Sequence, residues 1–74
     1  MVSKIDKIIC NYIAVHWIKP SPSNRSFAIN HNIDEKTVRK ILYTDGYRIP
    51  VKTLNEICES RELKLSQFFE LINQ

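Results

Sequence analysis

The feature that most constrains the fold of this chain is a pair of short amphipathic stretches in NRSFAINHNIDEKTVRKIL, residues 24–42. Their apolar periodicity predicts one helix over about 24–31 and a second over about 34–42. Asn32 stands between them, and asparagine tolerates the left-handed backbone conformation that ends a helix. Two helices joined by so few residues cannot lie antiparallel with full contact, so we expect them to cross at a steep angle.

The inner faces of these two helices are expected to be apolar. Ala28 is small enough to lie where the helices cross, and Ile33 supplies an apolar side chain in the turn. The predicted core positions of the segment are Phe27, Ala28, Ile33, Val38, Ile41 and Leu42. The outer face of the second helix is then polar and mostly basic. By itself this pattern also fits a helical hairpin in any small bundle.

The remaining segments predict further helices. The chain has 74 residues with one glycine and three prolines, and so few turn signals favour helices over strands. Helical periodicity covers 3–18 and 51–60, and a shorter helix is expected over 66–72, begun by Ser66. At the start of the chain, Ser3 can serve as an N-cap with Asp6 in the first turn. We therefore expect one domain, residues 1–74, with an all-α fold of five short helices.

The sequence offers little for catalysis. Cys10 and Cys58 each fall on an apolar helix face, which predicts buried, reduced thiols. His16 and His31 stand alone, away from other metal-ligand types. We find no nucleophile–base pair, and the single glycine rules out a glycine-rich phosphate loop. We therefore expect no enzyme activity, no metal or other cofactor, and no small-molecule ligand.

Charge and hydropathy give broader expectations. The formal net charge is +3, and its excess lies in residues 1–48, whereas residues 49–74 carry more acidic than basic groups. This distribution favours a polyanionic partner only weakly. The sequence has no apolar run long enough for a membrane span and no signal-peptide pattern at its start. These features predict a cytoplasmic protein without membrane association.

Several motifs carry a resemblance to a known family. The stretch NRSFAINHNIDEKTVRKIL, followed by GYRIPVKTLNEICES and LKLSQFF, resembles the Cro/repressor-type helix-turn-helix family, also called the xenobiotic-response-element family of bacterial and phage regulators. The match covers residues 24–72. Asn32 and Glu62 stand where the family often has glycine, and WIKPSPS is richer in proline than usual. The resemblance implies a five-helix, lambda-repressor-like DNA-binding domain with the helix-turn-helix at helices 2 and 3.

The resemblance also implies roles for individual residues. Positions that match the groove-facing side of the recognition helix are Glu35, Lys36, Thr37, Arg39 and Lys40. Positions that match contacts to the DNA backbone are Asn24, Arg25, Tyr43, Thr44, Tyr47, Arg48 and Lys52. The chemistry agrees, because arginine and lysine pair with guanine, threonine contacts bases or the thymine methyl, and glutamate accepts from cytosine. Each of these side chains also has an alternative interpretation as an ordinary solvated surface residue.

The resemblance implies a sequence-specific regulator of transcription that binds double-stranded DNA, with repression as the first expectation. Relatives of this type usually pair two recognition helices, so a homodimer is expected. The last helix offers Phe68, Leu71 and Ile72 as a possible dimer surface. Phe68 and Leu71 could instead close over the first helix. The alternative function is a protein-interaction or antitoxin-like partner module that uses the same fold without specific DNA readout.

Overall fold

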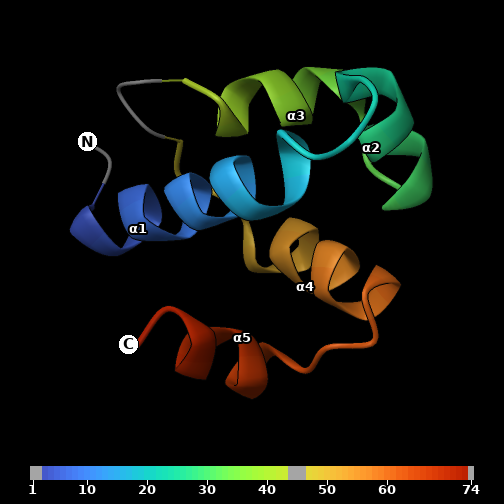
Figure 1. Ribbon diagram of the computed structural model, residues 1–74. Coiled ribbons are helices and arrows are strands. Elements are labelled where there is room, and N and C mark those ends of the chain that lie inside the picture. Colours follow the sequence, from blue (N-terminus) through green and yellow to red (C-terminus); the bar gives the residue numbers. More distant parts are fainter. Residues whose placement is uncertain (1–2, 44–46, 74) are drawn as a thin grey trace.

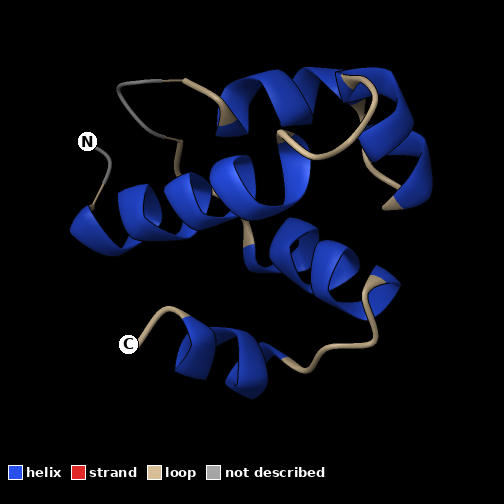
Figure 2. Cartoon of the chain, in the orientation of Figure 1, coloured by secondary structure: helices blue, strands red, loops and turns tan. Residues whose placement is uncertain are grey.

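A computed structural model of the chain describes residues 3–43 and 47–73, and all regular secondary structure in these two ranges is helical (Figures 1 and 2). The α-helices are α1 (Lys4–Ile13), α2 (Asn24–Asn30), α3 (Glu35–Ile41), α4 (Val51–Ser60) and α5 (Leu65–Leu71). The prediction of an all-α fold with five short helices is confirmed over this part of the chain. The predicted contact residue Thr44 lies outside the described residues.

The first helix begins as its sequence predicts and ends in a π-helical segment. The Ser3 hydroxyl accepts a hydrogen bond from the Asp6 amide at 3.2 Å, and the Asp6 carboxylate accepts one from the Ser3 amide at 3.4 Å. After Ile13 the helix widens into the π-helical segment η1 (Ala14–Ile18). The extra residue in this turn lets both Trp17 and Ile18 point into the core, where both are buried.

The turn between α2 and α3 explains how the two helices can follow each other so closely. Asn32 has φ 56°, the left-handed conformation predicted for it. The Ile33 amide donates to the Ala28 carbonyl at 3.0 Å, and the Asn32 amide donates to the Ile29 carbonyl at 3.3 Å. These two bonds define a Schellman motif, which ends α2 and turns the half-buried Ile33 back toward the core.

The end of α4 repeats this turn. Glu62 also has φ 56°, and the Leu63 amide donates to the Cys58 carbonyl at 2.9 Å. Glutamate has a Cβ that disfavours this conformation, yet the corner has the same geometry that asparagine gives at Asn32. The turn therefore forms with glutamate at this position.

The core lies where α1 meets the other helices. Figure 1 shows α1 between α3 on one side and α4 and α5 on the other. Phe27, Val38 and Ile57 are fully buried there, as the helical periodicity predicts. Ala28 is buried as well, in agreement with its predicted place between α2 and its neighbour. On α4, Cys58 is buried as predicted, and Leu54 and Ile57 are buried beside it.

Two predictions are wrong, one about a core residue and one about the start of a helix. Leu42 is 37% exposed, because α3 ends at Ile41 and Leu42 no longer follows its buried stripe. Helix α5 starts at Leu65 rather than at a Ser66 cap, and the Lys64 amide bonds the Gln67 side chain at 2.9 Å.

The third correction concerns the predicted dimer surface. Phe68 is 0% exposed and Ile72 is 9% exposed, so both belong to the core of one chain. The Phe68 ring lies 5.5 Å from the Trp17 ring and 5.7 Å from the Tyr12 ring, centroid to centroid. Aromatic pairs at these separations are favourable, and they draw α5 onto α1. Of the three predicted surface residues only Leu71, at 54%, is exposed.

Candidate nucleic-acid interface

The burial of one side of α3 determines which of its residues face solvent. Val38 and Ile41 are buried, so the opposite side of this short helix must face solvent. Lys36, Arg39 and Lys40 are exposed there. Glu35 and Thr37 are half-buried and flank them. Of the five residues predicted to contact bases, Lys36, Arg39 and Lys40 thus lie on the accessible side of the helix, and Glu35 and Thr37 lie at its two edges.

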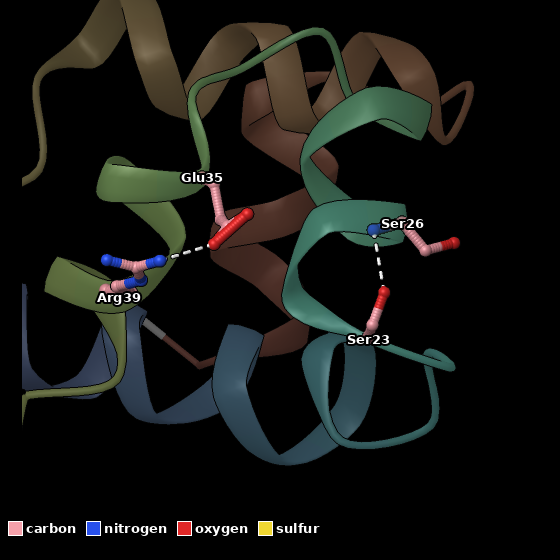
Figure 3. A network of polar contacts seen from close by, with 4 residues as sticks. All are labelled: Ser23, Ser26, Glu35 and Arg39. Carbon is pink, nitrogen blue, oxygen red and sulfur yellow. Dashed lines mark hydrogen bonds and ion pairs between the residues drawn. The ribbon is translucent and has the colours of Figure 1, made fainter.

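Glu35 and Arg39 form an ion pair along this face. The Arg39 Nη2 atom lies 2.5 Å from the Glu35 Oε2 atom, one helical turn away (Figure 3). The spacing of four residues places the two side chains beside each other on the helix surface. In the free protein the guanidinium of Arg39 is therefore already engaged by a carboxylate.

Thr37 lies on the side of α3 that faces α4. It lines a shallow hollow together with Asp34 from the turn and Lys52 and Glu56 from α4. Asp34 is the N-cap of α3 through its backbone alone, and its carbonyl accepts a hydrogen bond from the Val38 amide at 3.2 Å. Thr37 and Lys52, predicted respectively for base and backbone contacts, thus share one hollow at the edge of the basic face.

The segment after α3 contributes two tyrosines with different surroundings. Tyr43 is exposed. Tyr47 is half-buried, and its carbonyl accepts a hydrogen bond from the Cys10 thiol at 3.3 Å, which fixes this part of the chain to α1. Burial raises the pKa of the Tyr47 hydroxyl. The Lys40 ammonium lies 5.7 Å from the centre of the Tyr47 ring, within range of a cation–π contact.

The beginning of α2 is capped by Ser23. Its hydroxyl accepts a hydrogen bond from the Ser26 amide at 3.0 Å (Figure 3). Ser23 rather than Asn24 is therefore the N-cap of α2. Asn24 is then the first residue of the helix and is half-buried, and Arg25 beside it is exposed. The other predicted backbone contact, Arg48, is exposed ahead of α4.

Sequence reasoning missed a polar cluster that supports the turn ahead of α3. His31 is only 6% exposed and ends α2. Its Nδ1 lies 2.8 Å from the Phe27 carbonyl, and its Nε2 lies 3.1 Å from an Arg61 guanidinium nitrogen. The same guanidinium stands 4.5 Å from the centre of the Trp17 ring. Because His31 and Arg61 are far apart in sequence, no local pattern could have paired them.

The surroundings of His31 favour the neutral form of its ring. Burial lowers the pKa of His31, and the nearby positive charge of Arg61 lowers it further against the opposing effect of the Phe27 carbonyl. A neutral ring can donate from Nδ1 to Phe27 while its Nε2 accepts from Arg61. The neutral form therefore satisfies both neighbours at once.

The two cysteines are buried and unpaired with each other, as predicted. Burial raises the pKa of the Cys58 thiol to about 11 and also raises that of Cys10. Both are therefore poor sources of thiolate near neutral pH. In the two described ranges, no three or more His, Cys, Asp or Glu side chains come together in a group that could hold a metal ion.

Comparison of the chain with protein-family models, curated proteins and solved structures gives no match in any of the three searches. None of the helices in the described residues has the length and apolar character needed to cross a membrane.

Proposed function

We propose that this chain is a sequence-specific regulator of transcription that binds double-stranded DNA through the outer face of α3. The observation that carries the proposal is the arrangement of α2, the turn at Asn32 and α3. The turn fixes α3 beside α2, and the burial of Val38 and Ile41 leaves Lys36, Arg39 and Lys40 exposed. A helix-turn-helix protein uses such a second helix to enter the major groove.

The charge around α3 supports a role for phosphate contacts. Arg25, Arg48 and Lys52 are exposed at or near the ends of the neighbouring helices. Cations that flank a recognition helix contact phosphates and set the orientation of the protein, whereas side chains in the groove read the bases. In this proposal Lys36 and Arg39 carry base readout, and the flanking cations carry sequence-independent affinity.

The number of base pairs under one helix of this size is small, which supports binding as a pair of chains on two half-sites about one DNA turn apart. The burial of Phe68 and Ile72 removes most of the apolar surface first considered for this contact. Leu71 is the exposed apolar residue that α5 still offers in the described part of the chain.

A selection from genomic fragments with purified protein tests the proposal. A fluorescent duplex carrying the selected site, and a random duplex of equal length, are then titrated at two salt concentrations. We expect tighter binding to the selected site and a steep loss of affinity on both duplexes as salt rises, because phosphate contacts release counterions. Absence of binding at low salt, or equal affinity for both duplexes, contradicts the proposal.

A partner-binding module is the second candidate function. Two large apolar side chains favour it, because Ile29 is 68% exposed and Val51 is 70% exposed. Exposed apolar groups can form part of a protein contact, although single ones are common on any surface. Replacing both with serine separates the candidates: DNA affinity is retained if the chain acts through α3 alone.

A further inference from the structure

The carboxylate of Glu35 places a negative charge on the surface that is proposed to bind a polyanion. It lies on the same helix as Lys36, Arg39 and Lys40, and it holds the Arg39 guanidinium at 2.5 Å. Stability explains it only in part, because an exposed ion pair of this spacing and an acidic group in the first turn of a short helix each stabilise the fold only slightly. So small a gain in stability leaves room for a second role of the carboxylate, in the contact with DNA.

We propose that Glu35 is a specificity-determining residue, and that the Glu35–Arg39 pair selects DNA sites with a G·C base pair beneath this part of α3. This inference rests on the proposed function of α3 as a DNA-reading helix. It adds the class of base pair that the helix recognises and the residue that suppresses binding elsewhere.

Arg39 can exchange its contact with Glu35 for a contact of the same geometry with guanine. A carboxylate presents two oxygen acceptors to a guanidinium, and the O6 and N7 atoms of guanine present two adjacent acceptors in the major groove. Arg39 can therefore leave Glu35 for guanine and keep the same kind of paired contact. Adenine offers only one acceptor on that edge, beside a donor that repels the guanidinium.

The carboxylate of Glu35 also needs a new partner once Arg39 binds guanine. An unpaired Glu35 close to DNA would be repelled by phosphates and would lose its partner. Cytosine presents an N4 amino donor in the major groove, which a carboxylate can accept. A G·C pair thus offers a partner to each member of the ion pair, and the position of both side chains on one helical turn suits neighbouring base edges.

DNA that lacks such a G·C pair offers no new partner to either side chain. Non-specific binding is almost entirely phosphate electrostatics, and its strength follows the number of cations that replace counterions. Arg39 held by Glu35 contributes little net charge to that contact. Glu35 therefore weakens binding to random DNA more than it weakens binding to a matching site, and it widens the ratio between the two affinities.

The substitution E35Q tests the inference, because glutamine keeps the size of the side chain and removes its charge. The matched control is E70Q, which makes the same change of net charge at an exposed position on α5. Dissociation constants are measured on the selected site, on the same site with each G·C pair replaced, and on a random duplex. Thermal melts establish that both variants are folded.

We expect E35Q to bind random DNA more tightly and to lower the ratio of specific to random affinity by at least about fivefold, the lower end of what one paired base contact provides. The preference for G·C at one position should weaken with it. E70Q should leave the ratio unchanged. A second variant, R39K, keeps the charge but lacks the two-donor fork, and it should lose the same G·C preference while its salt dependence stays as in the parent chain.

Two results overturn the inference and are distinct from each other. If E35Q changes the affinity ratio no more than E70Q does, Glu35 has no role in specificity, although binding by the parent chain still supports the proposed function. If the parent chain binds no duplex at low salt, the proposed function fails and the inference fails with it.

Discussion

Arg61 donates a hydrogen bond to the Nε2 atom of His31 across 3.1 Å and joins the end of α4 to the end of α2. The His31 ring also stacks on the Phe27 ring at 3.9 Å, and Arg61 covers the Trp17 ring. These contacts fix the turn from which α3 begins. The position of the proposed DNA-reading face therefore depends on a buried histidine that must remain neutral.

This arrangement predicts that stability falls in mild acid. Burial lowers the pKa of His31 below its ordinary 6.5, so the folded chain binds a proton less readily than the unfolded chain. The contribution of His31 is fully present above about pH 6.5 and is lost as pH falls through its lower folded value. Urea unfolding at pH 8, 6.5 and 5 measures the change.

Two substitutions test whether His31 causes this fall in stability with pH. His31→Gln should remove the part of the slope that belongs to His31, whereas His16→Gln should retain it, because His16 is exposed on the first helix. A parent-like slope in the His31 variant would show that other groups cause the acid sensitivity.

The left-handed corner at Glu62 predicts a stabilising substitution. A non-glycine residue at positive φ costs about 1 kcal/mol or more, and glycine avoids that cost. Glu62→Gly should therefore raise the free energy of unfolding by about 1 kcal/mol, seen as a later urea midpoint. The control Glu59→Gly, inside α4, should lower it by a similar amount, because glycine disfavours a helix. Destabilisation by both would contradict the role of the corner.

Local rules account for much of the fold. The Ser3–Asp6 capping box and the turn at Asn32 follow from residue type, and the burial of Val38 follows from periodicity. Periodicity could not distinguish core from surface on α5, because that choice depends on which distant residue lies opposite. The rings of Tyr12 and Trp17 bury Phe68, and the sequence around Phe68 does not predict these two contacts.

The candidate site shows the same division. The exposed cations of α3 were predictable, because they are the residues left over when the apolar stripe faces the core. The Glu35–Arg39 pair fits the known preference for opposite charges four residues apart, but the spacing alone does not say that the pair forms. The His31–Arg61 contact required the tertiary structure.

Ala28 provides a test of the packing between α2 and its neighbours. It is 4% exposed, so a larger side chain has no room. Ala28→Leu should overpack the site and lower the free energy of unfolding by about 1–3 kcal/mol, measured by chemical denaturation. Asn30→Leu is the matched control, since Asn30 is exposed on the same helix and should change stability by less than about 0.5 kcal/mol. Equal effects would place Ala28 outside the tight contact.

The corrected burial of α5 predicts that neighbouring residues behave differently. Phe68→Ala should lower the free energy of unfolding by about 3–5 kcal/mol, because it empties an aromatic site in the core. Leu71→Glu should leave a folded chain but weaken any self-association on DNA, because Leu71 is exposed. Sedimentation with and without the selected duplex measures association. A chain that is monomeric on its best site, and that selects a site without symmetry, contradicts the dimer.

A comparison of Arg39 with Lys52 separates base readout from contact with the DNA backbone. Arg39 lies on the outer face of α3, where a guanidinium can reach base edges, whereas Lys52 is exposed at the beginning of α4. Arg39→Ala should cost about 1–3 kcal/mol on the selected site and far less on random DNA, because a base contact exists only at the right sequence. Lys52→Ala should weaken binding to both duplexes alike and reduce the slope of log affinity against log salt by about 1, because a phosphate contact is present on any sequence. Both variants are measured on the same two duplexes over a salt series. Equal losses for Arg39→Ala on both duplexes would assign Arg39 to the backbone and leave base readout to Lys36 and its neighbours.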